Sequence, residues 1–164
     1  MTTAPERTRI LFVCLGNICR SPTAEVVFRH AARRAGLAGR VATESAGLGD
    51  WHVGNPPDYR AVEHARRRGY DLSTLRASQI QVADFDRFEW ILPMDYPVLC
   101  ALEAMRPAHF NGQLRLFLEM APRLAVRDVP DPYDGGPEGF ELCLDLIEQG
   151  SEAFAASLAQ ALGH

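Results

Sequence analysis

Two cysteines and an arginine lie close together near the start of the chain. In the segment CLGNICRS, Cys14 is followed by five residues and then Arg20, with Cys19 just before the arginine and Ser21 just after it. A cysteine thiolate is a strong nucleophile, and a guanidinium grips two oxygens of a phosphate at once. This spacing is typical of a loop that holds a phosphate group over a nucleophile.

A short loop between the end of a strand and the start of a helix supplies the rest of such a site. Its backbone N–H groups can turn inward, and the helix N-terminus adds partial positive charge, so a dianion fits there. The residues that we expect to bind phosphate are Leu15, Gly16, Asn17, Ile18, Cys19, Arg20 and Ser21.

The same field favours the thiolate form of Cys14, to which Ser21 can donate its hydroxyl. Asn17 can support the loop through its amide or through a left-handed backbone conformation. A single cysteine after a strand is more often a buried core residue than a nucleophile. The interpretation of Cys14 as a nucleophile therefore depends on the whole segment CLGNICRS.

The flanking patterns predict strands that alternate with helices. Strands are expected at 9–13, 40–46 and 88–94, with a brief one near 126–129. Helices are expected from Ser21 as N-cap to Gly36, then at 58–69, 95–107, 114–118 and from about 137 to 162, where Gly150 weakens the middle. This alternation favours an α/β fold with a mostly parallel sheet, whose ligands bind beyond the C-terminal strand ends.

Composition narrows the class of protein. The 164 residues suit a single domain spanning 1–164, and 17 basic against 21 acidic residues provide no global field for nucleic acid. We find no secretory signal core and no apolar run long enough for a membrane span, so a cytoplasmic protein is expected. Its four cysteines should be reduced thiols, and the C-x4-C spacing lacks the second Cys/His pair that a metal site needs.

The string CLGNICRSP after a strand resembles the low-molecular-weight protein tyrosine phosphatase family. The likeness continues through ESAGLGDWHVGNPPDYRAV at 44–62, MD at 94–95 and DPYD at 131–134, and it covers nearly the whole chain. The resemblance implies a three-layer α/β sandwich with a central four-stranded parallel sheet and the phosphate-binding loop after the first strand. It also implies hydrolysis of phosphotyrosine and small aryl phosphates without a metal or cofactor.

The resemblance also assigns catalytic roles. Cys14 would attack phosphorus to form a cysteinyl-phosphate, while Arg20 and the loop amides stabilise the equatorial oxygens. Asp131 would protonate the leaving phenolate and then activate the water that hydrolyses the intermediate. Without this resemblance, Asp131 would be interpreted as an ordinary Asp-Pro turn residue.

The resemblance further implies that aromatic residues form the substrate cleft, although aromatic residues in a turn can also be ordinary packing residues. Trp51 and Tyr133 would flank a flat phenyl ring, with Leu15 and Ile18 on the rim. A deep cleft of this kind favours phosphotyrosine over the shorter phosphoserine. Asp134 stands where many members of the family have a second tyrosine, and its carboxylate should disfavour acidic substrates.

One departure from the family concerns the support of the loop. Members usually have a histidine, followed three residues later by an arginine, where this chain has Leu75 and Ser78. Because that histidine hydrogen-bonds the loop asparagine, we expect a softer phosphate loop around Asn17.

Cys19 is open to two interpretations. It can form a disulfide with Cys14 and so protect the nucleophile from irreversible oxidation, or it can be a small apolar filler under the loop. The two interpretations have equal weight.

Rival functions on the same fold remain as alternatives. An arsenate reductase would need two further cysteines closely spaced near the middle of the chain, which Cys100 and Cys143 do not provide. Protein-arginine phosphatases tend to carry threonine at the position of Ile18. Leu75 and Asp134 also motivate a phosphotyrosine-binding protein with little or no turnover. The expected partner is a phosphotyrosine protein or an aryl phosphate, and the expected state is a monomer or weak dimer.

Overall fold

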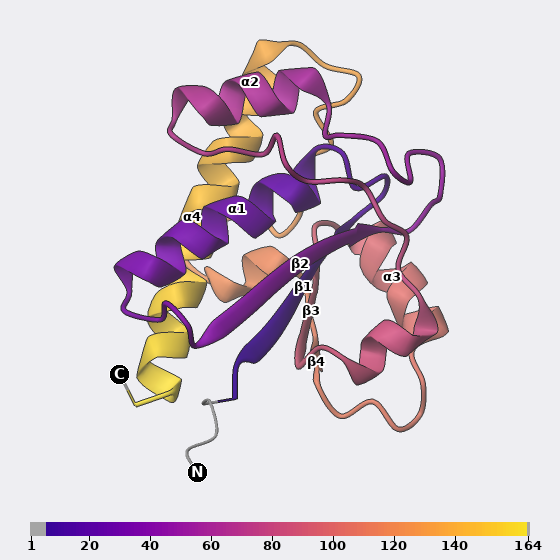
Figure 1. The fold of residues 1–164 in the computed structure, drawn as a ribbon, viewed down its shortest axis with the longest axis vertical. Helices are drawn as coiled ribbons and strands as arrows, with labels where there is room; N and C mark the ends of the chain where they lie inside the picture. Colours follow the sequence, from indigo (N-terminus) through magenta and orange to yellow (C-terminus); the bar gives the residue numbers. More distant parts are fainter. Residues whose placement is uncertain (1–5, 164) are drawn as a thin grey trace.

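The computed structural model describes residues 6–163. They form three layers, a central sheet with helices on each of its two faces (Figure 1). The sheet has the order β2-β1-β3-β4, and its paired strands are parallel. Its strands are β1 (Thr8–Cys14), β2 (Val41–Gly47), β3 (Trp90–Pro93) and β4 (Gln113–Leu114). The expected α/β sandwich with a four-stranded parallel sheet is confirmed.

Helices cover both faces of this sheet. They are α1 (Arg20–Arg34), α2 (Tyr59–Arg67), α3 (Tyr96–Met105) and α4 (Pro137–Ala161), with short 3-10 helices η1 (Val82–Asp86) and η2 (Phe117–Met120). Figure 1 shows α1 and α4 on one side of the sheet and α3 on the other. Among residues 6–163, no helix combines the length and apolar character that a membrane crossing requires.

The central strand β1 provides side chains to both hydrophobic layers. Ile10 and Phe12 belong to the cluster beneath α1 and α4, whereas Leu11 and Val13 belong to the cluster beneath α3. Because both faces of the strand are covered, its sequence is a continuous apolar run. This packing fixes the end of β1, where Cys14 lies.

The fourth strand is not where the sequence pattern placed it. Residues 126–129 form no strand. The fourth strand is β4 at Gln113–Leu114, which overlaps the first residue of the short helix predicted at 114–118, and the helical turn η2 there begins only at Phe117. Only Gln113 and Leu114 pair with β3. A strand of two residues is too short to show the alternation of polar and apolar residues that predicts a strand. Val129 still contacts the sheet region, because its N–H donates to the carbonyl of Met94 at 2.8 Å.

Two helix predictions also need correction. The helix α1 begins at Arg20 with Cys19 as N-cap, and Ser21 therefore lies inside the helix instead of capping it. The helix α4 continues through Gly150, where a Cβ would lie 2.6 Å from the ring of Phe117. Close packing against η2 outweighs the cost of about 1 kcal/mol for a glycine inside a helix.

Candidate active site

The loop between β1 and α1 has the shape that anion binding requires. The carbonyl groups of Cys14, Leu15 and Ile18 accept backbone N–H groups of neighbouring segments at 3.0, 3.0 and 2.8 Å. With these carbonyls held on the outside, the loop's own N–H groups can face the inside, beside the N-terminus of α1. Asn17 has φ of 59°, so the left-handed conformation expected there is confirmed.

Gly47 at the end of β2 allows this loop to lie against the sheet. A Cβ at this position would be 2.9 Å from the carbonyl carbon of Gly16 and 3.0 Å from the backbone nitrogen of Asn17. Such contacts are shorter than packed atoms tolerate, and both atoms belong to the backbone. A glycine is therefore required where the second strand passes the phosphate loop.

The thiol of Cys14 is buried and surrounded by donors. Its side chain lies at the base of the loop, with 2% of the residue exposed. The Ser21 hydroxyl lies 3.0 Å from the sulfur, and the backbone N–H of Asn17 donates to the sulfur at 3.3 Å. Donors aimed at the sulfur stabilise a negative charge there, which is the form that attacks phosphorus.

The side chain of Asn17 has all the support that the missing histidine was expected to provide. Its Nδ2 donates to the hydroxyls of Ser21 at 2.8 Å and Ser45 at 3.0 Å, while its Oδ1 accepts the backbone N–H of Ser78 at 2.9 Å. Leu75 packs against the larger hydrophobic cluster instead. The premise that Asn17 lacks support is wrong, because serine side chains and a backbone amide replace the histidine.

The support continues to a buried carboxylate that the sequence analysis did not single out. Ser45 donates to Oε1 of Glu25 at 2.7 Å, and Arg29 donates to Oε2 at 2.7 Å. Burial raises the pKa of Glu25, opposed by the hydrogen bonds from Ser45 and Arg29. Glutamate four residues before arginine on one helix was the available signal, but it is common on solvated helix faces.

Arg20 is buried at the entrance of α1 and faces the candidate acid. Its NH1 donates to Asp95 at 2.6 Å and to the carbonyl of Val129 at 3.0 Å, and its NH2 lies 3.6 Å from Oδ2 of Asp131. Burial opposes its charge, but Cys14, Asp95 and Asp131 outweigh that effect and raise the pKa of the guanidinium. The guanidinium of Arg20 is thus held in place and remains charged.

A pocket of about 170 Å³ opens above Cys14. It brings the three predicted catalytic side chains together with the predicted aromatic ones. Its lining residues are Cys14, Leu15, Gly16, Ile18, Cys19, Arg20, Trp51, His52, Asp131 and Tyr133. Trp51 is 65% and Tyr133 is 45% exposed, so both rings stand at the opening.

The structure differs from the sequence interpretation at His52 and at Asp134, which was predicted to edge the cleft. His52 lines the pocket, and its ring would lie 3.1 Å from a Cβ placed on Gly16; no motif in the sequence points to this histidine. Asp134 is exposed and is not among the lining residues.

Arg60 connects the phosphate loop to the segment that carries Asp131. Its guanidinium pairs with Asp58 at 2.9 Å and donates to the carbonyl of Tyr133 at 2.9 Å. The guanidinium carbon also lies 5.5 Å from the centre of the Tyr133 ring and 4.8 Å from that of Phe140. Asp58 in turn donates its N–H to the carbonyl of Ile18 at 2.8 Å, so one arginine and one aspartate bridge the two loops.

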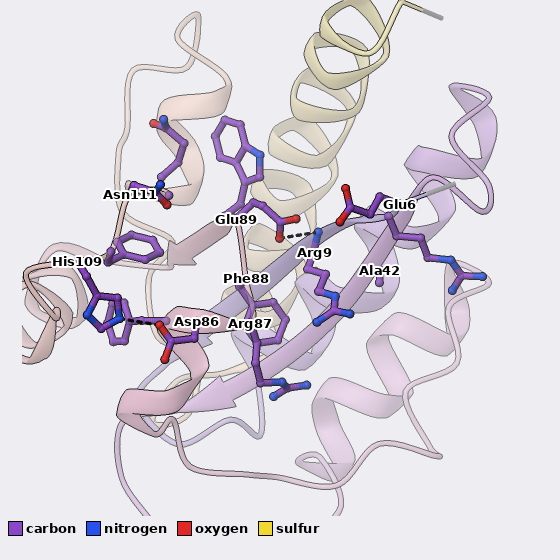
Figure 2. A pocket seen from close by; sticks show the side chains of 15 residues that line it. Glu6, Arg9, Ala42, Asp86, Arg87, Phe88, Glu89, His109 and Asn111 are labelled. Carbon is purple, nitrogen blue, oxygen red and sulfur yellow. Dashed lines mark hydrogen bonds and ion pairs between the residues drawn. The ribbon is translucent and has the colours of Figure 1, made fainter. Parts of the chain in front are cut away.

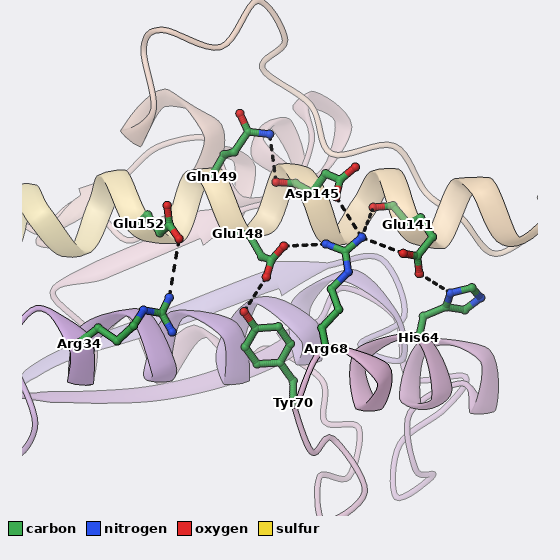
Figure 3. A network of polar contacts seen from close by, with 9 residues as sticks. All are labelled: Arg34, His64, Arg68, Tyr70, Glu141, Asp145, Glu148, Gln149 and Glu152. Carbon is green, nitrogen blue, oxygen red and sulfur yellow. Dashed lines mark hydrogen bonds and ion pairs between the residues drawn. The ribbon is translucent and has the colours of Figure 1, made fainter.

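A network of ion pairs fixes the helix that follows the acid segment (Figure 3). Arg68 donates to Glu141 at 2.8 Å and Glu148 at 2.6 Å, and it pairs with Asp145 at 3.0 Å. Burial opposes its charge, but the three carboxylates raise the pKa of Arg68. The start of α4 is thereby held against the segment after α2.

The environment of Cys19 differs from that of Cys14. It lines the same pocket but is 4% exposed, and burial, together with the charge of Asp58, raises the pKa of its thiol. All four cysteines are free thiols in the structure. Among residues 6–163, no group of three or more potential metal ligands is present.

Comparisons with known proteins agree with this geometry. Residues 9–163 match the model of the family described as low molecular weight phosphotyrosine protein phosphatase. The low molecular weight protein-tyrosine-phosphatase YfkJ of Bacillus subtilis is 40% identical over 149 residues, which are 91% of this chain and 94% of the relative.

Solved structures show the same likeness. A protein tyrosine phosphatase from Entamoeba histolytica with Hepes in its active site superimposes with a TM-score of 0.90 at 30% identity, covering 94% of this chain and 99% of the other. A structure of DARP, a Drosophila arginine phosphatase, superimposes with a TM-score of 0.84 at 29% identity, covering 91% of this chain and 96% of the other.

Proposed function

Because the chain belongs to the low molecular weight phosphotyrosine protein phosphatase family and is a protein tyrosine phosphatase, we propose that Cys14, Arg20 and Asp131 carry its chemistry. The observation that supports this assignment is the convergence of the three side chains on one pocket, where the guanidinium of Arg20 lies 3.6 Å from the carboxylate of Asp131. Cys14 attacks phosphorus in line with the phenolic oxygen, and a cysteinyl-phosphate forms.

The remaining loop residues stabilise the reacting phosphate. The guanidinium of Arg20 and the inward amides of residues 15–20 bind the equatorial oxygens, which carry charge in the transition state. Asp131 gives its proton to the leaving phenolate, and as a carboxylate it then takes a proton from the water that attacks the intermediate. Ser21 donates to the Cys14 sulfur when it leaves as a thiolate.

We propose phosphotyrosine in proteins and small aryl phosphates as the substrates. Trp51 and Tyr133 at the pocket opening can flank a phenyl ring, and Ile18 occupies the rim where arginine phosphatases tend to have threonine. The test is hydrolysis of matched phosphotyrosine, phosphoserine and phosphoarginine peptides by the wild type and by Cys14→Ser. Hydrolysis of the phosphotyrosine peptide alone, absent in the variant, is expected, whereas faster hydrolysis of phosphoarginine would reject this substrate.

We also propose that Cys19 protects the nucleophile and that the enzyme acts in the cytoplasm as a monomer or weak dimer. Peroxide would convert the Cys14 thiolate to a sulfenic acid, releasing hydroxide. The thiol of Cys19 would then displace water to form a disulfide, which thiols reduce again. Four cysteines in a chain of this size favour a reducing compartment over a disulfide scaffold.

A further inference from the structure

A hollow of about 380 Å³ lies between the last turns of α1 and the start of β2. Its charged or hydroxyl-bearing side chains are those of Arg7, Arg29, Arg33 and Thr43, and no carboxylate is among the lining residues that the structure describes. We call it the arginine hollow. Since a helix rises about 1.5 Å per residue, Arg33 lies roughly 20 Å along α1 from Arg20, so the hollow is separate from the catalytic pocket.

A neighbouring groove has a different charge pattern. The groove, about 1110 Å³ in volume, shares Arg7 and Ala42 with the arginine hollow. Figure 2 shows that the acidic side chains of Glu6, Asp86 and Glu89 also line it. Side chains of both charges line the groove, whereas the only charged side chains among the described residues that line the hollow are arginines.

The arginines of the hollow have donors to spare. Arg7 and Arg33 are exposed, and within residues 6–163 their side chains make no hydrogen bond or ion pair. Arg29 uses Nε and NH2 on Thr43 and Glu25, and its NH1 is left over among the contacts of the described residues. Two guanidinium groups and part of a third can therefore bind an incoming anion.

The positive potential is local, because the chain as a whole carries a net charge of -4. His30 lies on the same helix turn, and the pKa of its imidazole is lowered by burial and then by Arg33, Arg34 and Arg29. Guanidinium groups bind the oxygens of phosphate through paired, charge-assisted hydrogen bonds. The hydroxyl of Thr43, which accepts from Arg29, can add one further donor.

We propose that the arginine hollow binds a phosphate group, either free or as a monoester, at a site separate from the catalytic loop. Arg7, Arg29 and Arg33 supply the charge, and Thr43 orients the anion. Inorganic phosphate is the product of the enzyme's own reaction, so one source of the ligand is always present during turnover.

A chain of hydrogen bonds connects the arginine hollow to the catalytic loop. Arg29 donates to Glu25 at 2.7 Å, Ser45 donates to Glu25 at 2.7 Å, and Asn17 donates to Ser45 at 3.0 Å. An anion in the hollow shares the charge of Arg29 with Glu25. Occupancy of the hollow should therefore shift the amide signals of residues 29–43 and, through this chain of hydrogen bonds, those of residues 44 and 45.

The test is a phosphate titration of the full chain, labelled with nitrogen-15 and followed by NMR at constant ionic strength. The variant Arg7→Gln/Arg33→Gln removes two charges from the hollow without touching Glu25. The control Arg66→Gln/Arg67→Gln removes the same charge from two exposed residues of α2. We expect signals of residues 14–21 and of residues 29–43 to shift with two different affinities in the wild type and the control.

In Arg7→Gln/Arg33→Gln, the affinity at residues 29–43 should fall at least about tenfold, roughly one charge-assisted hydrogen bond, while that at residues 14–21 stays the same. Equal affinity in this variant and the control, or the same shifts with chloride, would overturn the proposal. A parallel titration with phosphoserine distinguishes the sources. If phosphoserine shifts the amide signals of residues 29–43, the hollow binds phosphate monoesters. If only inorganic phosphate shifts them, the hollow binds the free product.

Discussion

The side-chain amide nitrogen of Asn17, Nδ2, donates to the hydroxyl of Ser45 at 3.0 Å and so joins the phosphate loop to β2. Because Ser78 donates its backbone N–H to Oδ1 of Asn17, the amide has one orientation and both of its N–H groups face serine oxygens. The loop that binds phosphate is thus attached to β2 through Ser45, which does not line the catalytic pocket.

Replacing Ser45 by alanine tests this support. Ser45→Ala leaves one N–H of Asn17 without its partner, and we expect kcat/KM for aryl phosphates to fall about tenfold, the equivalent of one hydrogen bond. Ser78→Ala is the matched control, since Ser78 supports Asn17 through its backbone N–H. Steady-state kinetics of both variants provide the measurement, and equal loss in the two would contradict the account.

Introducing the family's histidine should bring no gain. Leu75→His places an imidazole in a side-chain position that packs against the hydrophobic core, while both Nδ2 hydrogens of Asn17 already have serine acceptors and its Oδ1 already accepts the N–H of Ser78. We expect a lower melting temperature and an unchanged affinity for inorganic phosphate, measured as competitive inhibition. Tighter phosphate binding in this variant would show that the loop was short of support after all.

The loss of activity on removal of Asp131 should depend on the leaving group. Asp131→Ala is expected to slow hydrolysis of a phosphotyrosine peptide by roughly 10²–10⁴-fold, the usual range for loss of general acid catalysis. The loss should be smaller for para-nitrophenyl phosphate, whose phenolate leaves without a proton. Asp134→Ala, which removes an exposed carboxylate outside the pocket lining, is the control. Equal losses in the two variants would place the acid elsewhere.

A methyl group on Gly47 should displace the phosphate loop. Gly47→Ala would place a Cβ 2.9 Å from the backbone of Gly16, and a shift of the loop of this kind costs on the order of 10²-fold in activity. Gly139→Ala provides the control, because its nearest contact is an ordinary 3.6 Å. The measurement is kcat/KM with circular dichroism to check folding, and full activity of Gly47→Ala would contradict the close approach.

The network around Arg68 predicts a pH dependence of stability. Hydrogen bonds from Arg68, and then from His64, lower the pKa of Glu141 in the folded state. A lowered carboxyl pKa contributes stability above the unfolded value of about 4.3, and this is lost as the pH falls through the folded value. The melting temperature of the wild type should therefore drop below about pH 4.5.

The comparison with Arg68→Gln isolates that contribution. This variant should be less stable near pH 7, by on the order of 1–2 kcal/mol, and its melting temperature should decline less on acidification. Arg123→Gln, an exposed arginine, should follow the wild type at every pH. Melting temperatures of the wild type and Arg68→Gln that fall in parallel with pH would argue against Arg68 as the cause of this pH dependence.

Oxidation tests the role of Cys19. After a brief exposure to peroxide, the wild type should regain activity with a thiol reductant, whereas Cys19→Ser should regain much less, because its sulfenic acid proceeds to irreversible forms. Cys143→Ser, another buried cysteine, is the control. Equal recovery of all three proteins would leave Cys19 as a packing residue.

Local sequence signals predicted β1, the loop and the start of α1 because strand, turn and helix are adjacent in the chain there. Long-range contacts were not predictable in the same way. Ser45 meets Asn17 from 28 residues away, and Arg60 reaches Tyr133 from 73 residues away. The two-residue strand β4 has no periodicity to detect, and its position follows only from pairing with β3.

The most direct test of the account is detection of phosphate on Cys14. Rapid acid quench of Asp131→Ala with para-nitrophenyl phosphate, followed by mass spectrometry, should find one phosphate on the peptide that contains Cys14, since loss of the base slows hydrolysis of the intermediate. The double variant Asp131→Ala/Cys14→Ser should carry none. Burst release of nitrophenol without phosphate on this peptide, or with phosphate on another residue, would contradict Cys14 as the nucleophile.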